Sequence, residues 1–189
     1  MKVLIFPTAQ AAVGNVVHEI SKLVTGVPNA RLGLATGGTM EPVYAGLVAQ
    51  KPDMSGVSTF NLDEYVGLPP DHPQCYRTYM ETHLFRPLGL KPEQTHLPAG
   101  DAQDPAQEAI DYENLIADGG IDLQLLGLGV NGHIGFNEPS SSLASPTRLK
   151  TLTKRTRADN ARYFAADEQV PHYAITMGIA TIMQARDII

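Results

Sequence analysis

Short apolar runs of strand length alternate along this chain with segments whose apolar residues recur at helical spacing. The runs expected to be strands are residues 2–6, 31–35, 57–61, 95–97, 121–126, 148–152 and 173–176, with a further one beginning at 187–189. The segments expected to be helices are residues 9–24, a stretch from about 40, and 75–85, 104–116, 159–164 and 178–184. Strands and helices in alternation are joined by right-handed crossovers and build a mostly parallel sheet. The sequence therefore predicts an α/β fold of three layers, a twisted, mostly parallel, Rossmann-like sheet with helices on both faces.

The length of 189 residues suits one α/β domain and is short for two. No repeat, low-complexity segment or linker divides the chain, so we expect residues 1–189 to form a single domain. The last residues, 187–189, look like the first part of a strand, and three residues are fewer than strands usually have. We therefore expect the natural protein to continue past residue 189 and the C-terminal part of the fold to lie outside this sequence.

Composition excludes several classes of protein. The net charge is −6, whereas a nucleic-acid-binding domain usually presents a basic face. No apolar run approaches membrane-spanning length. Cys75 is the only cysteine, so the chain cannot form an internal disulfide, which fits a reducing cytoplasm. We expect a cytoplasmic protein that binds neither nucleic acid nor membrane.

A glycine-rich loop, residues 127–139, follows the apolar run 121–126. Its two titratable groups are His133 and Glu138, and the loop also carries the amide of Asn131. Polar loops that follow buried strands are where α/β proteins place their chemistry, because the strands hold such loops in position. A near-neutral imidazole beside a carboxylate predicts acid–base chemistry in this loop.

A second polar turn, Thr36, Gly37, Gly38 and Thr39, lies between a predicted strand and a predicted helix with Pro42 in its first turn. Glycines let the backbone approach an anion, and the free N–H groups of a helix start then point at it. This geometry favours a phosphate cradle. A tight turn without a ligand accounts for the local pattern about equally well, because short Gly-Gly turns are common in α/β proteins.

A third cluster contains Asp63 and Glu64, just after the predicted strand at residues 57–61. One of these carboxylates is a candidate general base, although an isolated Asp-Glu pair is more often a helix cap or a surface turn. All three clusters follow strands of one parallel sheet, so they should meet at one edge. A cradle, a base and a His–Glu pair together predict proton transfer on a phosphorylated metabolite. No cysteine or histidine spacing indicates a metal, and no GxGxxG motif opens the first strand–helix unit, so we do not expect a bound dinucleotide.

Four segments carry a resemblance to a known family. They are residues 34–39 (LATGGT), 60–68 (FNLDEYVGL), 127–139 (GLGVNGHIGFNEP) and 141–151 (SSLASPTRLKT). The chain resembles the isomerising glucosamine-6-phosphate deaminases along its whole length, and the second and third segments are long and specific. The resemblance implies that glucosamine 6-phosphate and water give fructose 6-phosphate and ammonia, a reaction of amino-sugar catabolism, without a cofactor.

The resemblance also implies roles for the polar residues. His133 would move a proton between O1 and the ring oxygen to open the sugar, and Glu138 would orient and polarise the imidazole with help from Asn131. Asp63 would take the proton from C2 and deliver it to C1. The residues implied to hold the phosphate are Thr36, Gly37, Gly38, Thr39 and Arg162. Many members carry aspartate in place of Asn131, and since an amide cannot accept the proton we expect His133 and Glu138 to carry ring opening between them.

The fourth segment resembles the allosteric region of hexameric family members, where N-acetylglucosamine 6-phosphate binds at a subunit interface. The matching positions are Ser141, Arg148, Lys150 and Thr151. The resemblance thus points to a small-molecule activator and a homo-oligomer, but monomeric family members keep related sequence in this segment, so a monomer without an activator stays open.

Two alternatives use the same fold. A 6-phosphogluconolactonase would show a GHxAS-type continuation after its histidine, where this chain has GHIGFNE at residues 132–138, and would favour arginine where this chain has Tyr65. A sugar-phosphate-sensing regulator would need a helix-turn-helix segment before the first strand, and it would not require the set of Asp63, His133 and Glu138.

Overall fold

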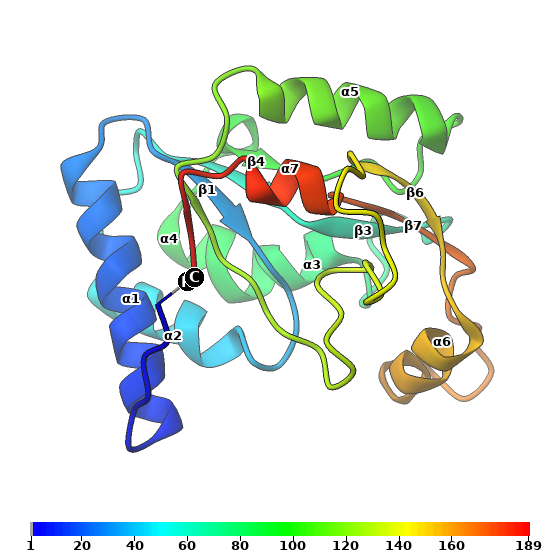
Figure 1. Ribbon diagram of the computed structural model, residues 1–189, viewed down its shortest axis with the longest axis horizontal. Coiled ribbons are helices and arrows are strands. Elements are labelled where there is room, and N and C mark those ends of the chain that lie inside the picture. Colours follow the sequence, from blue (N-terminus) through cyan, green and yellow to red (C-terminus); the bar gives the residue numbers. More distant parts are fainter. Residues whose placement is uncertain (1) are drawn as a thin grey trace.

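The computed structural model describes residues 2–189, and a five-stranded parallel sheet runs through its centre (Figure 1). The strand order is β4-β2-β1-β5-β8, and every pair in it is parallel. The strands are β1 (Arg31–Leu34), β2 (Ser58–Asn61), β4 (Thr95–His96), β5 (Leu123–Gln124) and β8 (Asp187–Ile188). The predicted mostly parallel sheet is confirmed.

Helices cover both faces of this sheet, with α5 and α7 on one side and α1 and α2 on the other (Figure 1). The α-helices are α1 (Ala9–Gly26), α2 (Glu41–Gln50), α3 (Tyr76–Met80), α4 (Arg86–Leu88), α5 (Pro105–Ala117), α6 (Lys154–Asn160) and α7 (Ile179–Met183). A π-helix, η1 (Glu81–Phe85), joins α3 to α4, and two 3₁₀ segments are η2 (Pro92–Gln94) and η3 (Ala161–Tyr163). The side chains of Thr8 and Asp104 cap α1 and α5, because each accepts backbone N–H groups that have no partner inside the helix.

A second, smaller sheet stands beside the first. It is antiparallel with the order β3-β7-β6, and its strands are β3 (Asp63–Val66), β7 (Tyr173–Thr176) and β6 (Arg148–Thr151). The strands predicted at residues 148–152 and 173–176 are confirmed. The stretch 61–65, which we expected to be a polar loop, instead continues from β2 into β3, so Asp63 lies on a strand.

The main core fills the space between the parallel sheet and α1, α2 and η1. Its largest fully buried side chains include Tyr44, Phe60, Phe85, Ile20, Leu32, Leu34, Leu47, Met80, Leu84 and Leu125. Burial of each such side chain contributes about 1.5–3 kcal/mol, so β1 and β2 are held firmly and the loops at their carboxyl ends start from fixed points. A smaller cluster of Tyr65, Phe136 and Phe164 packs against the antiparallel sheet.

The predicted first strand, residues 2–6, is wrong. This segment has no regular structure, and Val3, Leu4 and Ile5 are 70, 51 and 92 % exposed. An apolar run becomes a strand only when another strand takes its backbone hydrogen bonds, and neither edge of the described sheet pairs with it. Across residues 2–189, the helices are too short or too polar to cross a bilayer.

Candidate active site

The loop at residues 127–139 is closed on itself by backbone hydrogen bonds. The amide of Gly129 donates to the carbonyl of His133 at 2.9 Å, and Gly132 donates back to Gly129 at 2.8 Å. Ile134 and Asn137 exchange a reciprocal pair at 3.1 and 2.9 Å. Next to them, Phe136 is buried against Tyr65 of β3, so the loop is pinned to the small sheet. A loop fixed in this way can hold an imidazole in one place.

The imidazole of His133 lies directly over the backbone of Gly129. A Cβ at Gly129 would overlap the ring, so only glycine admits this close approach. The ring nitrogen Nδ1 of His133 is 2.6 Å from Oδ1 of Asn131, which also accepts the backbone N–H of His133 at 3.2 Å. The other end of the Asn131 amide, Nδ2, donates to Oε2 of Glu138 at 2.8 Å. The Asn131 amide therefore connects His133 to Glu138.

These contacts fix which nitrogen of His133 carries the proton. An ionised carboxylate only accepts hydrogen bonds, so Glu138 must face the NH₂ group of Asn131. The amide oxygen of Asn131 then faces Nδ1, and because that oxygen can only accept, Nδ1 must be the donor. In the neutral ring this leaves the lone pair on Nε2, which can take a proton from a bound molecule.

Asp63 lies across from this loop and is 6 % exposed. Its strand pairs with β7, where Asp63 is opposite Thr176. A Cβ at Gly135 would lie 3.0 Å from Oδ2 of Asp63 and 3.1 Å from Oγ1 of Thr176, and Gly135 has a φ of +56°. Only a glycine lets the histidine loop come this close to the carboxyl group. The predicted meeting of the Asp63 cluster with the His133 loop is thereby confirmed.

The buried position changes the acidity of Asp63. Burial, reinforced by the negative charge of Glu64, raises the pKa of Asp63 from its ordinary 3.8 to about 8. A carboxyl group whose pKa is near neutral can exchange protons with a substrate at working pH.

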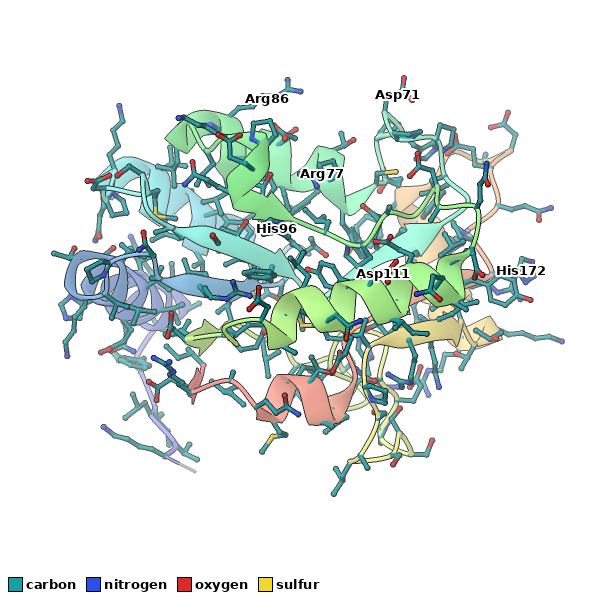
Figure 2. The ribbon with its side chains drawn as sticks, turned by 90° about the horizontal axis from the view of Figure 1, so that it is seen from above. Asp71, Arg77, Arg86, His96, Asp111 and His172 are labelled. Carbon is teal, nitrogen blue, oxygen red and sulfur yellow. The ribbon has the colours of Figure 1, made fainter. Side chains whose placement is uncertain are left out.

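The neighbouring acid, Glu64, has a structural task. Its carboxylate accepts the backbone N–H groups of Tyr65, Tyr76 and Arg77, each at 2.9 Å. It thus caps the start of α3, which is the plainer of the two interpretations of the Asp-Glu pair. Nη1 of Arg77, a residue labelled in Figure 2, donates to Oγ1 of Thr95 of β4 at 3.0 Å. The two adjacent acids therefore differ, because Glu64 is engaged as a cap and Asp63 faces the histidine loop.

The turn of residues 36–39 leaves β1 and leads into α2. Gly37 has a φ of +111°, which other residues rarely adopt, and its carbonyl accepts the amide of Met40 and the hydroxyl of Tyr79, both at 2.9 Å. Thr36 is partly exposed, while Gly37, Gly38 and Thr39 are exposed. A Cβ at Gly127 would lie 3.3 Å from Cε of Met40, so the turn lies beside the start of the histidine loop. All three polar clusters thus meet at the carboxyl ends of the strands.

Arg162 stands apart from that turn. It lies in η3, where its guanidinium donates to the hydroxyl of Tyr163 at 2.8 Å and stacks 4.7 Å from the centre of that ring. Figure 1 shows α6 and the adjoining η3 at the opposite end of the molecule from α1. Among residues 2–189, the hydrogen bond and the cation–π contact of the Arg162 side chain are both with Tyr163, and neither kind of interaction joins it to residues 36–39.

The four predicted allosteric positions divide into two pairs. Lys150 and Thr151 of β6 line a cavity of about 10 Å³ together with His133 and Glu138. The amide of Ser141 donates to the carbonyl of Glu138 at 2.8 Å. The guanidinium of Arg148 donates to the carbonyl of Pro146 at 3.4 Å, and burial lowers its pKa.

Sequence reasoning missed Thr156 and Thr176. Thr156 of α6 donates to Oε1 of Glu138 at 2.9 Å, and Thr176 of β7 donates from its hydroxyl toward the carbonyl of Met177 at 3.4 Å while standing beside Asp63. Thr153 is of a residue type favoured at the N-cap of a helix, and this was the available signal for Thr156. No local signal pointed to Thr176. In the part of the chain that the structure describes, no three His, Cys, Asp or Glu side chains gather as a metal site.

The parallel sheet of this α/β protein gathers an imidazole, a buried carboxyl group and a glycine turn before a helix at one edge, a set of groups suited to acid–base chemistry. Residues 7–189 match the family described as glucosamine-6-phosphate isomerases/6-phosphogluconolactonase. The chain belongs to this family.

Individual relatives support the same assignment. The chain is 50% identical to a glucosamine-6-phosphate deaminase of Hahella chejuensis, over 100% of this chain and 74% of the relative. It is also 50% identical to one of Streptomyces avermitilis, over 100% and 75%. A solved monomeric glucosamine-6-phosphate deaminase superposes with a TM-score of 0.95 at 41% identity, covering 100% of this chain and 80% of that one. A 6-phosphogluconolactonase from Thermotoga maritima has a TM-score of 0.75 at 18% identity, covers 99% and 80%, and shares the fold.

Proposed function

We propose that this protein is a cytoplasmic, isomerising glucosamine-6-phosphate deaminase, a hydrolase that acts on a C–N bond. It would convert glucosamine 6-phosphate and water to fructose 6-phosphate and ammonia within a single domain. The observation that carries the proposal is the position of Asp63, which faces the histidine loop across Gly135 while Nε2 of His133 remains free to accept a proton. Relatives at 50% identity that bear this name support it.

The first step is the opening of the sugar ring. Nε2 of His133 takes the proton of the O1 hydroxyl, the bond between C1 and the ring oxygen breaks, and the same proton is returned to the ring oxygen. The imidazole is positively charged between these two events. The Asn131 amide donates to Glu138 and accepts from Nδ1 of His133. The carboxylate polarises this amide, which stabilises the imidazolium and holds it in position.

The second step is isomerisation and loss of ammonia. Asp63, as the carboxylate, removes the proton from C2 while the aldehyde oxygen O1 takes up a proton, which gives an enolamine. Asp63 then delivers its proton to C1 while the amino group gives one up, so that no net proton is gained or lost. The product is an imine at C2, which water hydrolyses to the ketose and ammonia. Burial raises the pKa of Asp63 to about 8. The carboxylate is therefore a stronger base than an ordinary aspartate, which favours removal of the proton from C2. The carboxylic acid that results can still donate the proton to C1 near neutral pH.

The phosphate would rest on the turn of residues 36–39, where exposed backbone amides precede the ten-residue helix α2. For Arg162 to join it, η3 must move from its present contact with Tyr163. Exchange of Arg162 for Met should then raise KM for the sugar phosphate, and an unchanged KM would remove Arg162 from the phosphate site.

The deciding experiment follows fructose 6-phosphate and ammonia in a coupled assay. We expect both products in equal amounts from glucosamine 6-phosphate, no turnover by Asp63→Asn, and slow turnover by His133→Gln. Turnover of 6-phosphogluconolactone without ammonia release from the amino sugar would overturn the proposal. Asn131→Leu, of similar volume, should lower kcat because the imidazole loses its connection to Glu138.

We propose also that Lys150 and Thr151 make the site responsive to N-acetylglucosamine 6-phosphate, since both line the cavity beside His133 and Glu138. Ser141 and Arg148 would complete the activator site. Addition of this sugar phosphate should lower KM for the substrate, and Lys150→Met should abolish that response. The oligomeric state, measured by light scattering with and without the activator, tests whether a homo-oligomer is needed.

A further inference from the structure

Among the hydrogen bonds of residues 2–189, that of the Thr156 side chain joins helix α6 to the histidine loop. None of the residues of α6 (Lys154–Asn160) is buried, so the helix is not held by apolar packing of its own side chains. The hydroxyl of Thr156 donates to Oε1 of Glu138 at 2.9 Å. Farther along α6, Nη1 of Arg157 lies 3.4 Å from Nε2 of His172, which is labelled at the outer end of the small sheet in Figure 2.

The direction of each hydrogen bond around Thr156 follows from its acceptor. Glu138 as a carboxylate only accepts, so Thr156 must give its one hydroxyl proton to it. The hydroxyl of Thr153 is 2.7 Å from that of Thr156, and its proton must therefore point to Oγ1 of Thr156. Oγ1 of Thr153 in turn accepts the backbone N–H of Thr156 at 3.0 Å, as the cap of α6. Two hydroxyl groups in series thus end on Glu138.

Glu138 is consequently held at both oxygens. Oε1 takes the hydroxyl of Thr156, and Oε2 takes the amide of Asn131, whose other end fixes Nδ1 of His133. The side chain of Glu138 is partly exposed, so without the hydroxyl its carboxylate can turn toward water. The cavity of about 10 Å³ beside these groups has the size of one water molecule, which could then compete for the carboxylate.

We propose that Thr156 is a positioning residue for ring opening. Its hydroxyl holds Glu138 against Asn131, and Asn131 then keeps His133 in the form with the proton on Nδ1 and the lone pair on Nε2. This inference rests on the proposed function for its catalytic consequence. Its structural half, the tautomer of His133, does not need a substrate.

The kinetic test compares Thr156→Val, Thr156→Ser and a matched control. Thr156→Val keeps the shape and loses the hydroxyl, and we expect kcat to fall about tenfold while KM changes less than about twofold. Thr156→Ser restores the hydroxyl and should return kcat to within about threefold of the wild type. Thr82→Val makes the same exchange at an exposed position of η1, where the hydroxyl bonds only the carbonyl of Thr78, and should leave both constants unchanged.

The second test reads the tautomer directly in the resting protein. In ¹⁵N spectra of histidine-labelled protein, the signals of His133 are identified by their absence in His133→Gln. We expect the wild type and Thr156→Ser to show the form protonated on Nδ1, and Thr156→Val to show a mixture of the two tautomers. This measurement is independent of turnover, so it separates failure of the inference from failure of the proposed function.

Each outcome decides the matter. Wild-type kcat and unchanged His133 signals in Thr156→Val would overturn the inference. An altered tautomer in a protein that never deaminates the sugar would leave the positioning role standing and remove the proposed function. If Thr156→Val does not fold, Thr156→Ala takes its place.

In a Glu138→Gln background, loss of the Thr156 hydroxyl should cost less than about twofold in kcat, because the two residues act as a unit. A full additional tenfold loss there would show that Thr156 acts by another route.

Discussion

Asp63→Asn should make the protein more stable at neutral and alkaline pH while it removes activity. The exchange keeps the size of the side chain and deletes its charge. Folding raises the pKa of Asp63 from 3.8 to about 8, chiefly by burial, so the folded protein holds this proton over a range where the unfolded chain has released it. By linkage, the stability contributed by Asp63 is fully present below about pH 4 and is lost as the pH rises to about 8.

The magnitude follows from the cost of one pKa unit, about 1.36 kcal/mol. Relative to pH 4 and below, ionisation of Asp63 lowers the free energy of unfolding by about 3 kcal/mol at pH 6 and by about 5–6 kcal/mol at pH 8 and above, as an order of magnitude. A typical domain unfolds with about 5–15 kcal/mol, so this one carboxyl group weighs heavily on stability. We therefore expect Asp63→Asn to match the wild type near pH 4 and to exceed it by several kcal/mol at pH 8.

Urea unfolding of the wild type and Asp63→Asn at pH 4.5, 6 and 8 provides the measurement. Asp111→Asn is the matched control, because Asp111 is an exposed carboxylate on the outer side of α5 (Figure 2). Its curve should follow that of the wild type. The reasoning is refuted if the difference in unfolding free energy between Asp63→Asn and the wild type is the same at all three values of pH.

Three further predictions concern the same site. The pH profile of kcat/KM should rise to a plateau with a midpoint near pH 8, because Asp63 must lose its proton before it can act as a base; a rise centred near pH 4 would contradict this. Gly135→Ala should lower kcat at least tenfold, because the new Cβ would lie 3.0 Å from Oδ2 of Asp63, whereas Gly14→Ala, in open space on α1, should preserve kcat in the same assay. Glu64→Gln should lower the unfolding free energy by about 1–3 kcal/mol, because it replaces one of the two oxygens that accept backbone N–H groups by an NH₂ donor; urea unfolding measures this, and an unchanged midpoint would exclude the cap.

Elements whose signals are local could be predicted from the sequence. Thr8 and Asp104 start α1 and α5 because each accepts N–H groups within three residues, a relation visible in the sequence itself. The parallel sheet followed from the alternation of strands and helices. By contrast, the apolar run at residues 2–6 satisfied every local rule for a strand and still does not form one. A strand also needs a neighbouring strand to take its backbone hydrogen bonds.

The antiparallel sheet was harder to foresee. β3 begins at Asp63, and its pairing partner, Thr176, is far along the chain, so no window of sequence shows both. The position of Asp63 on a strand decides its burial, and burial decides its pKa. Likewise, Glu64 is a cap because α3 begins at Tyr76, on the far side of a loop whose path the sequence does not reveal.

Within the site, the sequence indicated the residues of the histidine loop but did not show which of their side chains hydrogen-bond to one another. The resemblance implied that Glu138 orients and polarises the imidazole of His133, with Asn131 in support. In the structure the amide lies between them, and Glu138 bonds to Asn131 and Thr156. Thr156 lies outside the loop, so its hydrogen bond to Glu138 depends on where α6 begins.

The small antiparallel sheet gives the two acid–base groups different mechanical supports. The backbone of Asp63 is hydrogen-bonded into β3 and β7, whereas that of His133 belongs to a loop closed by a few bonds of its own. Amide hydrogens of β3 and β7 should therefore exchange with solvent only when the whole domain opens, and those of residues 129–134 should exchange through local fluctuations. The carboxyl group proposed to handle the carbon-bound proton is thus carried on a paired strand, and the imidazole proposed to open the ring is carried on a loop held by fewer hydrogen bonds.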